Sequence, residues 1–94
     1  MLPIFEKGKY ILDFSASWCQ PCNRIAPYFK ILGDENENIK FIKFDVEIDR
    51  EIALEFNIQA MPTFISIHDG NIIERFEGAS KDKLREMVDK LNSL

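Results

Sequence analysis

The 94 residues include 46% hydrophobic and 12% aromatic side chains, which suffice for one domain with its own core, residues 1–94, and leave no room for a second. Asp and Glu number 16 against 12 Lys and Arg, and the formal net charge of −4 argues against nucleic acid or an anionic membrane surface as a partner. Because no apolar run approaches the ~18 residues of a membrane span, and residues 1–10 lack the basic stretch of a secretory signal, we expect a cytoplasmic protein.

The first half of the chain predicts a strand, a helix and a second strand. Residues 10–14 form an apolar run with a single acid, which is typical of a strand buried on both faces. A helix is expected over residues 21–32, because proline is tolerated in the first helical turn; Pro27 should kink this helix and Gly33 should end it. Residues 41–46 then form the second strand.

The second half predicts a short helix, a hairpin and a final helix. Asp49 can cap the short helix, and residues 63–67 form a third strand. The turn signal Asp69-Gly70-Asn71 returns the chain as an antiparallel strand over residues 72–76. Ser80 caps the final helix, whose apolar side chains recur at i, i+3, i+4 and i+7: Leu84, Met87, Val88 and Leu91.

Together these elements predict an α/β fold in the order β-α-β-α-β-β-α. Strand–helix–strand units imply parallel pairing and the hairpin adds an antiparallel strand, so we expect a mixed four-stranded sheet with helices on both faces. Functional sites in such sheets lie beyond the carboxyl ends of the parallel strands. Cys19 and Cys22 lie at this place, between the first strand and the first helix.

The cysteine pair is better suited to chemistry than to stabilising the fold. Closing so short a loop adds only about 2 kcal/mol of stability. A thiolate is the nucleophile in disulfide exchange, and the N-terminus of a helix stabilises its negative charge. We expect the sulfur of Cys19, at the helix start, to point to solvent and attack, while Cys22 lies shielded one turn further in and resolves the product.

Metal binding is the main alternative for two cysteines at this spacing. A structural zinc site needs four Cys or His ligands, and beyond the pair this chain has only one histidine, His68, which we expect to be exposed and far from the cysteines. Pro21 also favours a helix start over a metal-binding turn. No bound metal is therefore expected, and a site shared by two chains is the form of metal binding left open.

A wider set of residues accompanies the cysteines. It comprises Leu12-Asp13-Phe14, Trp18-Cys19-Gln20-Pro21-Cys22, Pro27, Lys43-Phe44-Asp45-Val46, Met61-Pro62-Thr63, Gly70 and Gly78. With this set the chain resembles the thioredoxin family over nearly its whole length from residue 10 onward. The resemblance implies a thioredoxin-like fold and a protein-disulfide reductase without a bound cofactor, whose redox group is a disulfide between Cys19 and Cys22. It also implies disulfide-containing protein substrates, a thioredoxin-reductase-like partner, a role in electron transport and cell redox homeostasis, and a monomer.

Asp13 and Lys43 receive roles from the same resemblance. Burial in an apolar strand should by itself raise the pKa of Asp13, and the alternative is an exposed acid at a strand edge. By resemblance, Asp13 is the buried acid that helps to deprotonate Cys22 through a water molecule, and Lys43 is its neighbour. Taken alone, Lys43 is an ordinary exposed strand lysine.

The substrate groove is likewise implied by the resemblance. In the family, the peptide bond at the position of Met61–Pro62 is cis, and the backbone before the proline pairs with an extended substrate segment. A trans proline that opens a strand is the alternative, and Trp18 could also be a core aromatic. The expected substrate-binding residues are Trp18, Gln20, Pro21, Met61, Pro62 and Gly78.

Four departures from the family pattern leave parts of the function open. Gln20 stands where glycine is common, Ser15 replaces an aromatic residue, and Asn23 replaces a basic one; these changes put the reduction potential and the partner reductase in doubt. Nine residues precede Tyr10, fewer than the roughly 17 that a strand and a helix need. We therefore expect the leading strand of the family to be absent and Pro3 to start a single helical turn.

Three other functions are alternatives. A thioredoxin-fold adaptor would bind a partner through the same groove, with incidental cysteines. A glutaredoxin usually has a tyrosine between its cysteines, so Gln20 and Trp18 point away from that function. A disulfide oxidase or isomerase differs mainly in reduction potential, which spans about 150 mV among proteins of this type.

Overall fold

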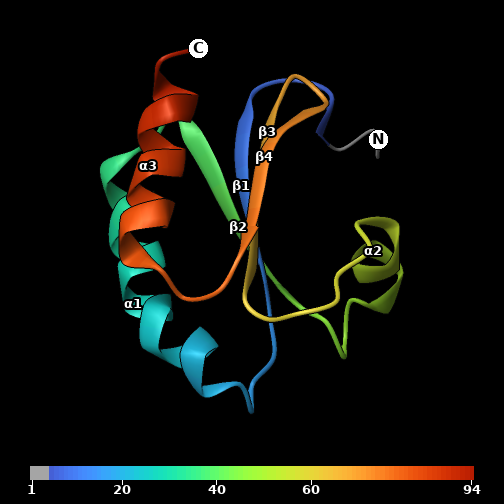
Figure 1. Cartoon of the computed structure of the whole chain (residues 1–94). Helices are drawn as coiled ribbons and strands as arrows, with labels where there is room; N and C mark the ends of the chain where they lie inside the picture. Colours follow the sequence, from blue (N-terminus) through green and yellow to red (C-terminus); the bar gives the residue numbers. More distant parts are fainter. Residues whose placement is uncertain (1–4) are drawn as a thin grey trace.

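The computed structural model describes residues 5–94, whose elements follow the predicted order (Figure 1). The strands are β1 (Lys9–Ser15), β2 (Ile39–Asp45), β3 (Thr63–His68) and β4 (Asn71–Glu77), and the helices are α1 (Gln20–Glu35), α2 (Arg50–Glu55) and α3 (Lys81–Asn92). Within the described residues β1 is the first strand, and the helical turn expected at Pro3 lies outside them. Among the described residues, no helical segment combines the length and the hydrophobicity of a membrane span.

The strands form a mixed sheet in the order β2-β1-β3-β4. β1 and β2 are parallel, whereas β1 pairs with β3, and β3 with β4, in antiparallel fashion. The prediction of parallel pairing for the second strand–helix–strand unit is therefore wrong. Its helix α2 has six residues and spans only about 9 Å, which is too short to carry the chain back along a strand of about 23 Å. β2 consequently ends, and β3 begins, at the same end of the sheet, beside Phe14 and Ser15 of β1.

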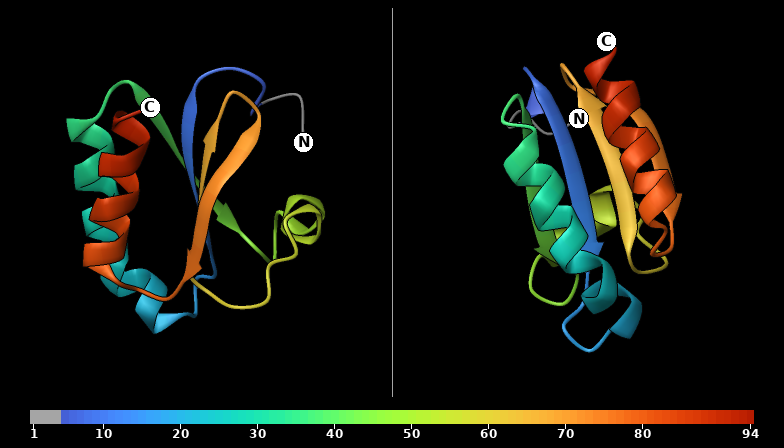
Figure 2. Two further views of the ribbon diagram at one scale, coloured as in Figure 1. Left: turned by 45° about the horizontal axis from the view of Figure 1, so that its top comes forward. Right: turned by 90° about the vertical axis from the view of Figure 1, so that its left-hand side faces the viewer.

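Helices cover both faces of the sheet, as predicted: α1 and α3 lie on one face and α2 on the other (Figure 2). β1 is buried on both faces because its side chains alternate between these two layers. Ile11 packs with buried side chains of α1 and α3, while Tyr10, Leu12 and Phe14 pack on the side of α2. β1 is thus an inner strand, and the cysteines follow its carboxyl end.

Helix α1 is longer than predicted because Gly33 does not end it. The helix continues beyond Gly33, and Asn36 closes it by donating from Nδ2 to the Leu32 carbonyl (2.8 Å). A Cβ at Gly33 would lie 3.4 Å from Phe41 Cβ of β2. The glycine therefore allows close packing of the helix on the strand and does not form a left-handed helix end. Pro27 lies inside the helix.

The predicted turn and helix caps are present with one exception. Asp69 and Gly70 have φ values of 49° and 84°, as a two-residue hairpin turn requires. Ser80 Oγ accepts a backbone N–H of the first turn of α3 (3.1 Å). Asp49 precedes α2, but its carboxylate accepts the Asp45 N–H (3.0 Å) and makes no hydrogen bond to the helix. This carboxylate therefore stabilises the turn after β2.

Phe5 is a core residue that the sequence pattern did not indicate. Its side chain is fully buried, and its ring centroid lies 5.2 Å from that of Tyr10 and 6.2 Å from that of Phe56. The hairpin turn holds this segment, because the Gly8 N–H donates to Asp69 Oδ1 (2.8 Å) and the Asp69 N–H donates to the Gly8 carbonyl (2.9 Å). Phe5 thereby completes the apolar cluster between the sheet and α2.

Candidate active site

The cysteine pair lies at the start of α1, beyond the carboxyl end of β1, as predicted. Cys19 is the N-cap residue, and its Sγ accepts the Cys22 N–H (3.3 Å). The two sulfurs form a disulfide. Cys22 is 1% exposed and Cys19 6% exposed, so the prediction of a sulfur pointing freely to solvent is too strong. Cys19 is nevertheless the more accessible of the two.

The helix start favours negative charge on the sulfur of Cys19. Free backbone N–H groups point toward this end of α1, and one of them already reaches Cys19 Sγ. The first turn contains no acidic side chain, and Pro21 occupies a position where a backbone donor is not needed. When the disulfide is reduced, this environment stabilises a thiolate at Cys19, which is the reactive form in disulfide exchange.

Asp13 is buried in the middle of the sheet and is not an edge residue. It is 1% exposed, on β1 between β2 and β3. Burial raises the pKa of Asp13 from its ordinary value of 3.8 to about 6, and the positive charge of Lys43 opposes this shift. Lys43 is the register partner of Asp13 on β2 and is itself exposed. The lysine thus is both an exposed strand residue and the charged neighbour of the buried acid.

The raised pKa of Asp13 predicts that an Asp13→Asn variant of the oxidised protein is more stable at pH 8. Folding favours the protonated acid, so this stability is fully present below pH 3.8 and is lost as the pH rises through about 6. The shift corresponds to about 3 kcal/mol in the free energy of unfolding. Urea unfolding at pH 3.5 and pH 8 measures it: the variant should gain stability at pH 8 and converge with the parent protein at pH 3.5. An equal gain at both pH values would contradict the assignment.

The predicted groove residues lie around the cysteines. The Met61–Pro62 peptide bond is cis, and the Met61 carbonyl oxygen lies 3.8 Å from Cys19 Sγ. The Gly78 N–H donates to the Pro62 carbonyl (2.9 Å). This hydrogen bond ties the loop before α3 to the segment that contains the cis proline. Gly78 has φ 106°, and no atom lies within 4 Å of the place its Cβ would occupy. Its backbone therefore borders open space beside the cis proline.

Trp18 is exposed and is not a core aromatic. Its exposed fraction is 62%, in the loop between β1 and α1. Gln20 and Pro21, which follow it around Cys19, are exposed as well. An apolar ring next to a reactive sulfur can contact an incoming protein segment.

Two apolar residues at the site were not assigned a role from the sequence. Ala16 is buried with Cys19 and Cys22, and Val46 packs against the same cluster. Val46 immediately follows β2. Two signals pointed to it: its membership in the set of residues that carries the thioredoxin resemblance, and its place at a carboxyl end beside β1.

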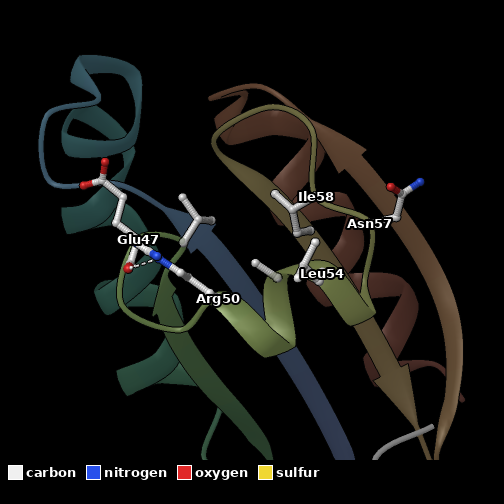
Figure 3. A pocket seen from close by; sticks show the side chains of 7 residues that line it. Glu47, Arg50, Leu54, Asn57 and Ile58 are labelled. Atoms are coloured by element: carbon white, nitrogen blue, oxygen red, sulfur yellow. Dashed lines mark hydrogen bonds between the residues drawn. The ribbon is translucent and has the colours of Figure 1, made fainter.

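Val46 also lines a neighbouring hollow of about 390 Å³ at α2 (Figure 3). Arg50, Leu54 and Ile58 form much of its wall, and Arg50 Nε donates to the Glu47 carbonyl (3.1 Å). Val46 is the lining residue that this hollow shares with the apolar cluster around the cysteines, and Glu47 and Arg50 bring charged groups to the hollow.

Metal binding finds no support in the described part of the chain. Among residues 5–94, no group of three or more His, Cys, Asp or Glu side chains could hold an ion. His68 lies at the end of β3 beside the hairpin turn, with Nε2 3.5 Å from Asp69 Oδ2, and it is half-buried and not exposed as predicted. The cysteines are at the opposite end of the sheet, because Lys9 at the start of β1 pairs with His68.

Comparison with known proteins identifies the relatives of this chain. The family model for thioredoxin matches residues 4–90. Thioredoxin H5 of Arabidopsis thaliana is 44% identical over 95% of this chain and 75% of its own length. Thioredoxin of Oryctolagus cuniculus is 40% identical over 86% of this chain and 77% of its own length. The X-ray structure of Fasciola hepatica thioredoxin superposes with a TM-score of 0.88 and 41% identity, covering 92% of this chain and 84% of the other.

The family match and the neighbouring cysteines disfavour an adaptor with incidental cysteines. Thioredoxins exchange electrons with disulfide-containing substrates through a cysteine pair of this kind, are reduced again by a reductase, and need no bound cofactor. The chain belongs to the thioredoxin family and is a dithiol–disulfide oxidoreductase.

Proposed function

We propose that this protein is a cytoplasmic protein-disulfide reductase in which Cys19 attacks the substrate and Cys22 resolves the mixed disulfide. The observation that carries the assignment of roles is the position of Cys19. It is the N-cap of α1, the more exposed of the two cysteines, and the one next to the Met61 carbonyl. Cys22 is enclosed one turn further along the helix and reacts only after Cys19 has formed the mixed disulfide.

The proposed reaction consumes one substrate disulfide for each protein dithiol. The Cys19 thiolate bonds to one substrate sulfur, the substrate S–S bond breaks, and the first substrate thiolate leaves. Cys22 then loses its proton to the Asp13 carboxylate, and its sulfur bonds to Cys19 Sγ while the second substrate thiolate leaves. Two electrons pass to the substrate, which ends as two thiols, and the protein ends as the Cys19–Cys22 disulfide.

The proposed docking surface surrounds Cys19. The backbone at Met61 would pair with an extended segment of the substrate, as in strand addition. Gly78 leaves room for that segment, because no atom lies within 4 Å of the place that its Cβ would occupy. The exposed ring of Trp18 would contact the flanking residues. The proposed binding residues are Trp18, Gln20, Pro21, Met61, Pro62 and Gly78.

The cellular setting is proposed from the chemistry. A dithiol reductase works where thiols are kept reduced, which favours the cytoplasm and electron transfer from a thioredoxin-reductase-like partner. We propose one domain over residues 1–94 that acts as a monomer, since one chain carries both cysteines and the buried acid. The net charge of −4 supports protein substrates over nucleic acid or anionic membranes.

The reduction potential of the cysteine pair tests the direction of electron flow. Thioredoxins have potentials of about −270 mV, at or below a cytosolic glutathione poise of about −220 to −260 mV. We expect a value in this reducing range, measured by equilibration with glutathione redox buffers and alkylation of free thiols. The reduced form of the protein should also reduce the disulfide of a test protein. A value near about −120 mV, typical of a strong oxidant, would overturn the reductase assignment and favour an oxidase.

A further inference from the structure

Two buried polar side chains beside the cysteines lack a protein partner. Asp13 Oδ1 and Ser15 Oγ make no hydrogen bond within residues 5–94, and both residues are 1% exposed. Buried polar atoms in folded proteins are almost always hydrogen-bonded, either to protein or to an ordered water. Each of the two atoms therefore calls for a hydrogen-bond partner that residues 5–94 do not supply.

Asp13 and Ser15 project from the same face of β1, because they are two residues apart on a strand. Ile11 shares this face and packs against α1. The buried stripe of α1 begins at Cys22 and continues with Ile25. The carboxyl and the hydroxyl therefore face the start of α1, on the side where Cys22 is enclosed.

Ser15 also lines a hollow of about 420 Å³ at the carboxyl ends of β1 and β2. Its walls include the exposed residues Ser17, Asn23 and Lys43, so the hollow is in contact with solvent. Lys43 is the register partner of Asp13. The hollow thus borders Ser15, whose buried hydroxyl lies two residues along β1 from the buried carboxyl.

We propose that Ser15 is a positioning residue, whose hydroxyl and the Asp13 carboxyl together hold a water molecule that carries protons between Asp13 and the hollow. The proposal rests on the proposed function, in which Asp13 accepts the proton of Cys22. In that step the Cys22 S–H bond breaks, the proton binds the carboxylate, and the sulfur bonds to Cys19 Sγ as the substrate thiolate leaves. The water at Ser15 then takes the proton from Asp13 to solvent and restores the carboxylate, so no further reactant is needed.

The residues around Asp13 favour the side of Ser15 as the polar route for protons between the acid and solvent. β2 contributes the positive charge of Lys43, β3 contributes the uncharged Phe64 as the register partner, and α1 contributes Cys22. The hollow contains two further charged groups, Asp45, which is the register partner of Ser15 on β2, and Asp49. Apart from Lys43, these neighbours of Asp13 on β2, β3 and α1 carry no charge, and we expect the acid to exchange protons with solvent where Ser15 borders the hollow.

Ser15→Val and Ser15→Thr form a matched test, because valine and threonine have the same shape and only threonine keeps the hydroxyl. Ser15→Val should slow the resolution of a mixed disulfide by Cys22 roughly fivefold, the loss of about one hydrogen bond, and should raise the pKa of Asp13 in a carboxyl-carbon NMR titration. Ser15→Thr should keep both properties. Alkylation of Cys19 by iodoacetamide should proceed at the same rate in all three proteins, since this step does not use Asp13.

Asp13→Asn separates this inference from the proposed function. If Asp13→Asn slows resolution and Ser15→Val does not, the role of Ser15 is overturned while the role of Asp13 stands. If neither variant slows resolution, Asp13 is not the base and both proposals fail. Equal slowing by Ser15→Val and Ser15→Thr would show that the added methyl group matters instead of the hydroxyl, and would also overturn the proposal.

Discussion

A Cys22→Ser variant will accumulate a covalent complex with disulfide-bonded substrates, whereas a Cys19→Ser variant will not. Cys19 is the more exposed of the two cysteines, and its Sγ accepts the Cys22 N–H at the start of α1, so it can attack without the Cys22 thiol. Removing Cys22 leaves no thiol within reach to displace the substrate, and the mixed disulfide persists. Both variants should lose catalytic turnover, by at least about 100-fold, because the resolving or the attacking nucleophile is gone.

The complex is measured by non-reducing electrophoresis and mass spectrometry of the trapped species after mixing with a disulfide-bonded test protein. The matched control is the double variant Cys19→Ser/Cys22→Ser, which should bind no substrate covalently. Equal trapping by Cys19→Ser would reverse the assigned roles. Disulfide reduction by the double variant at the parent rate would mean that the cysteines are not the redox group at all.

A Phe5→Ala variant will lose about 3–5 kcal/mol of the free energy of unfolding, the usual cost of removing a fully buried phenylalanine. The Phe5 ring is fully buried and contacts Tyr10 and Phe56 edge-on. The truncation would leave a cavity in the cluster that packs α2 on the sheet. Equilibrium urea unfolding of the oxidised protein, with the midpoint and slope fitted together, measures the loss.

Two control variants place this loss in context. Phe5→Leu keeps an apolar side chain of similar size and should cost less than half as much. Leu54→Ala removes a large apolar side chain that is 80% exposed, so it should change stability by no more than about 0.5 kcal/mol. A loss at Phe5→Ala no larger than that at Leu54→Ala would show that residue 5 is not part of the core in solution.

The active-site motif shows how much of the site can be predicted from local sequence patterns. Cys19 and Cys22 could be placed at a helix start from the sequence, because the apolar strand before them and Pro21 are local signals. The enclosure of Cys19 was underestimated, since it comes in part from Val46 and Met61, which lie in separate segments. Contacts between segments far apart in the chain leave no periodic signal in either of them.

The elements of the fold also divide into those that local patterns predict and those that contacts between distant segments decide. The final helix follows from the spacing of its apolar residues, and the hairpin follows from Asp69-Gly70, because helical periodicity and turn geometry depend on neighbouring residues. The direction of β3 and the length of α1 do not follow from local patterns. The first depends on how far a six-residue helix can carry the chain, and the second on the close approach of Gly33 to Phe41.

The sequence by itself determined the class of chemistry, since two cysteines one helical turn apart after a buried strand suit disulfide exchange and too few other ligands are present for zinc. It also determined that Asp13 is an acid in an apolar strand. Only the tertiary structure decided that this acid lies on an inner strand, beside Lys43 and next to an unpartnered Ser15. The physical reason is that the burial and the pKa of a group depend on every segment packed around it, and not only on its neighbours in the chain. For the same reason, the place of Phe5 in the core and the place of β3 in the sheet were decided by the tertiary structure.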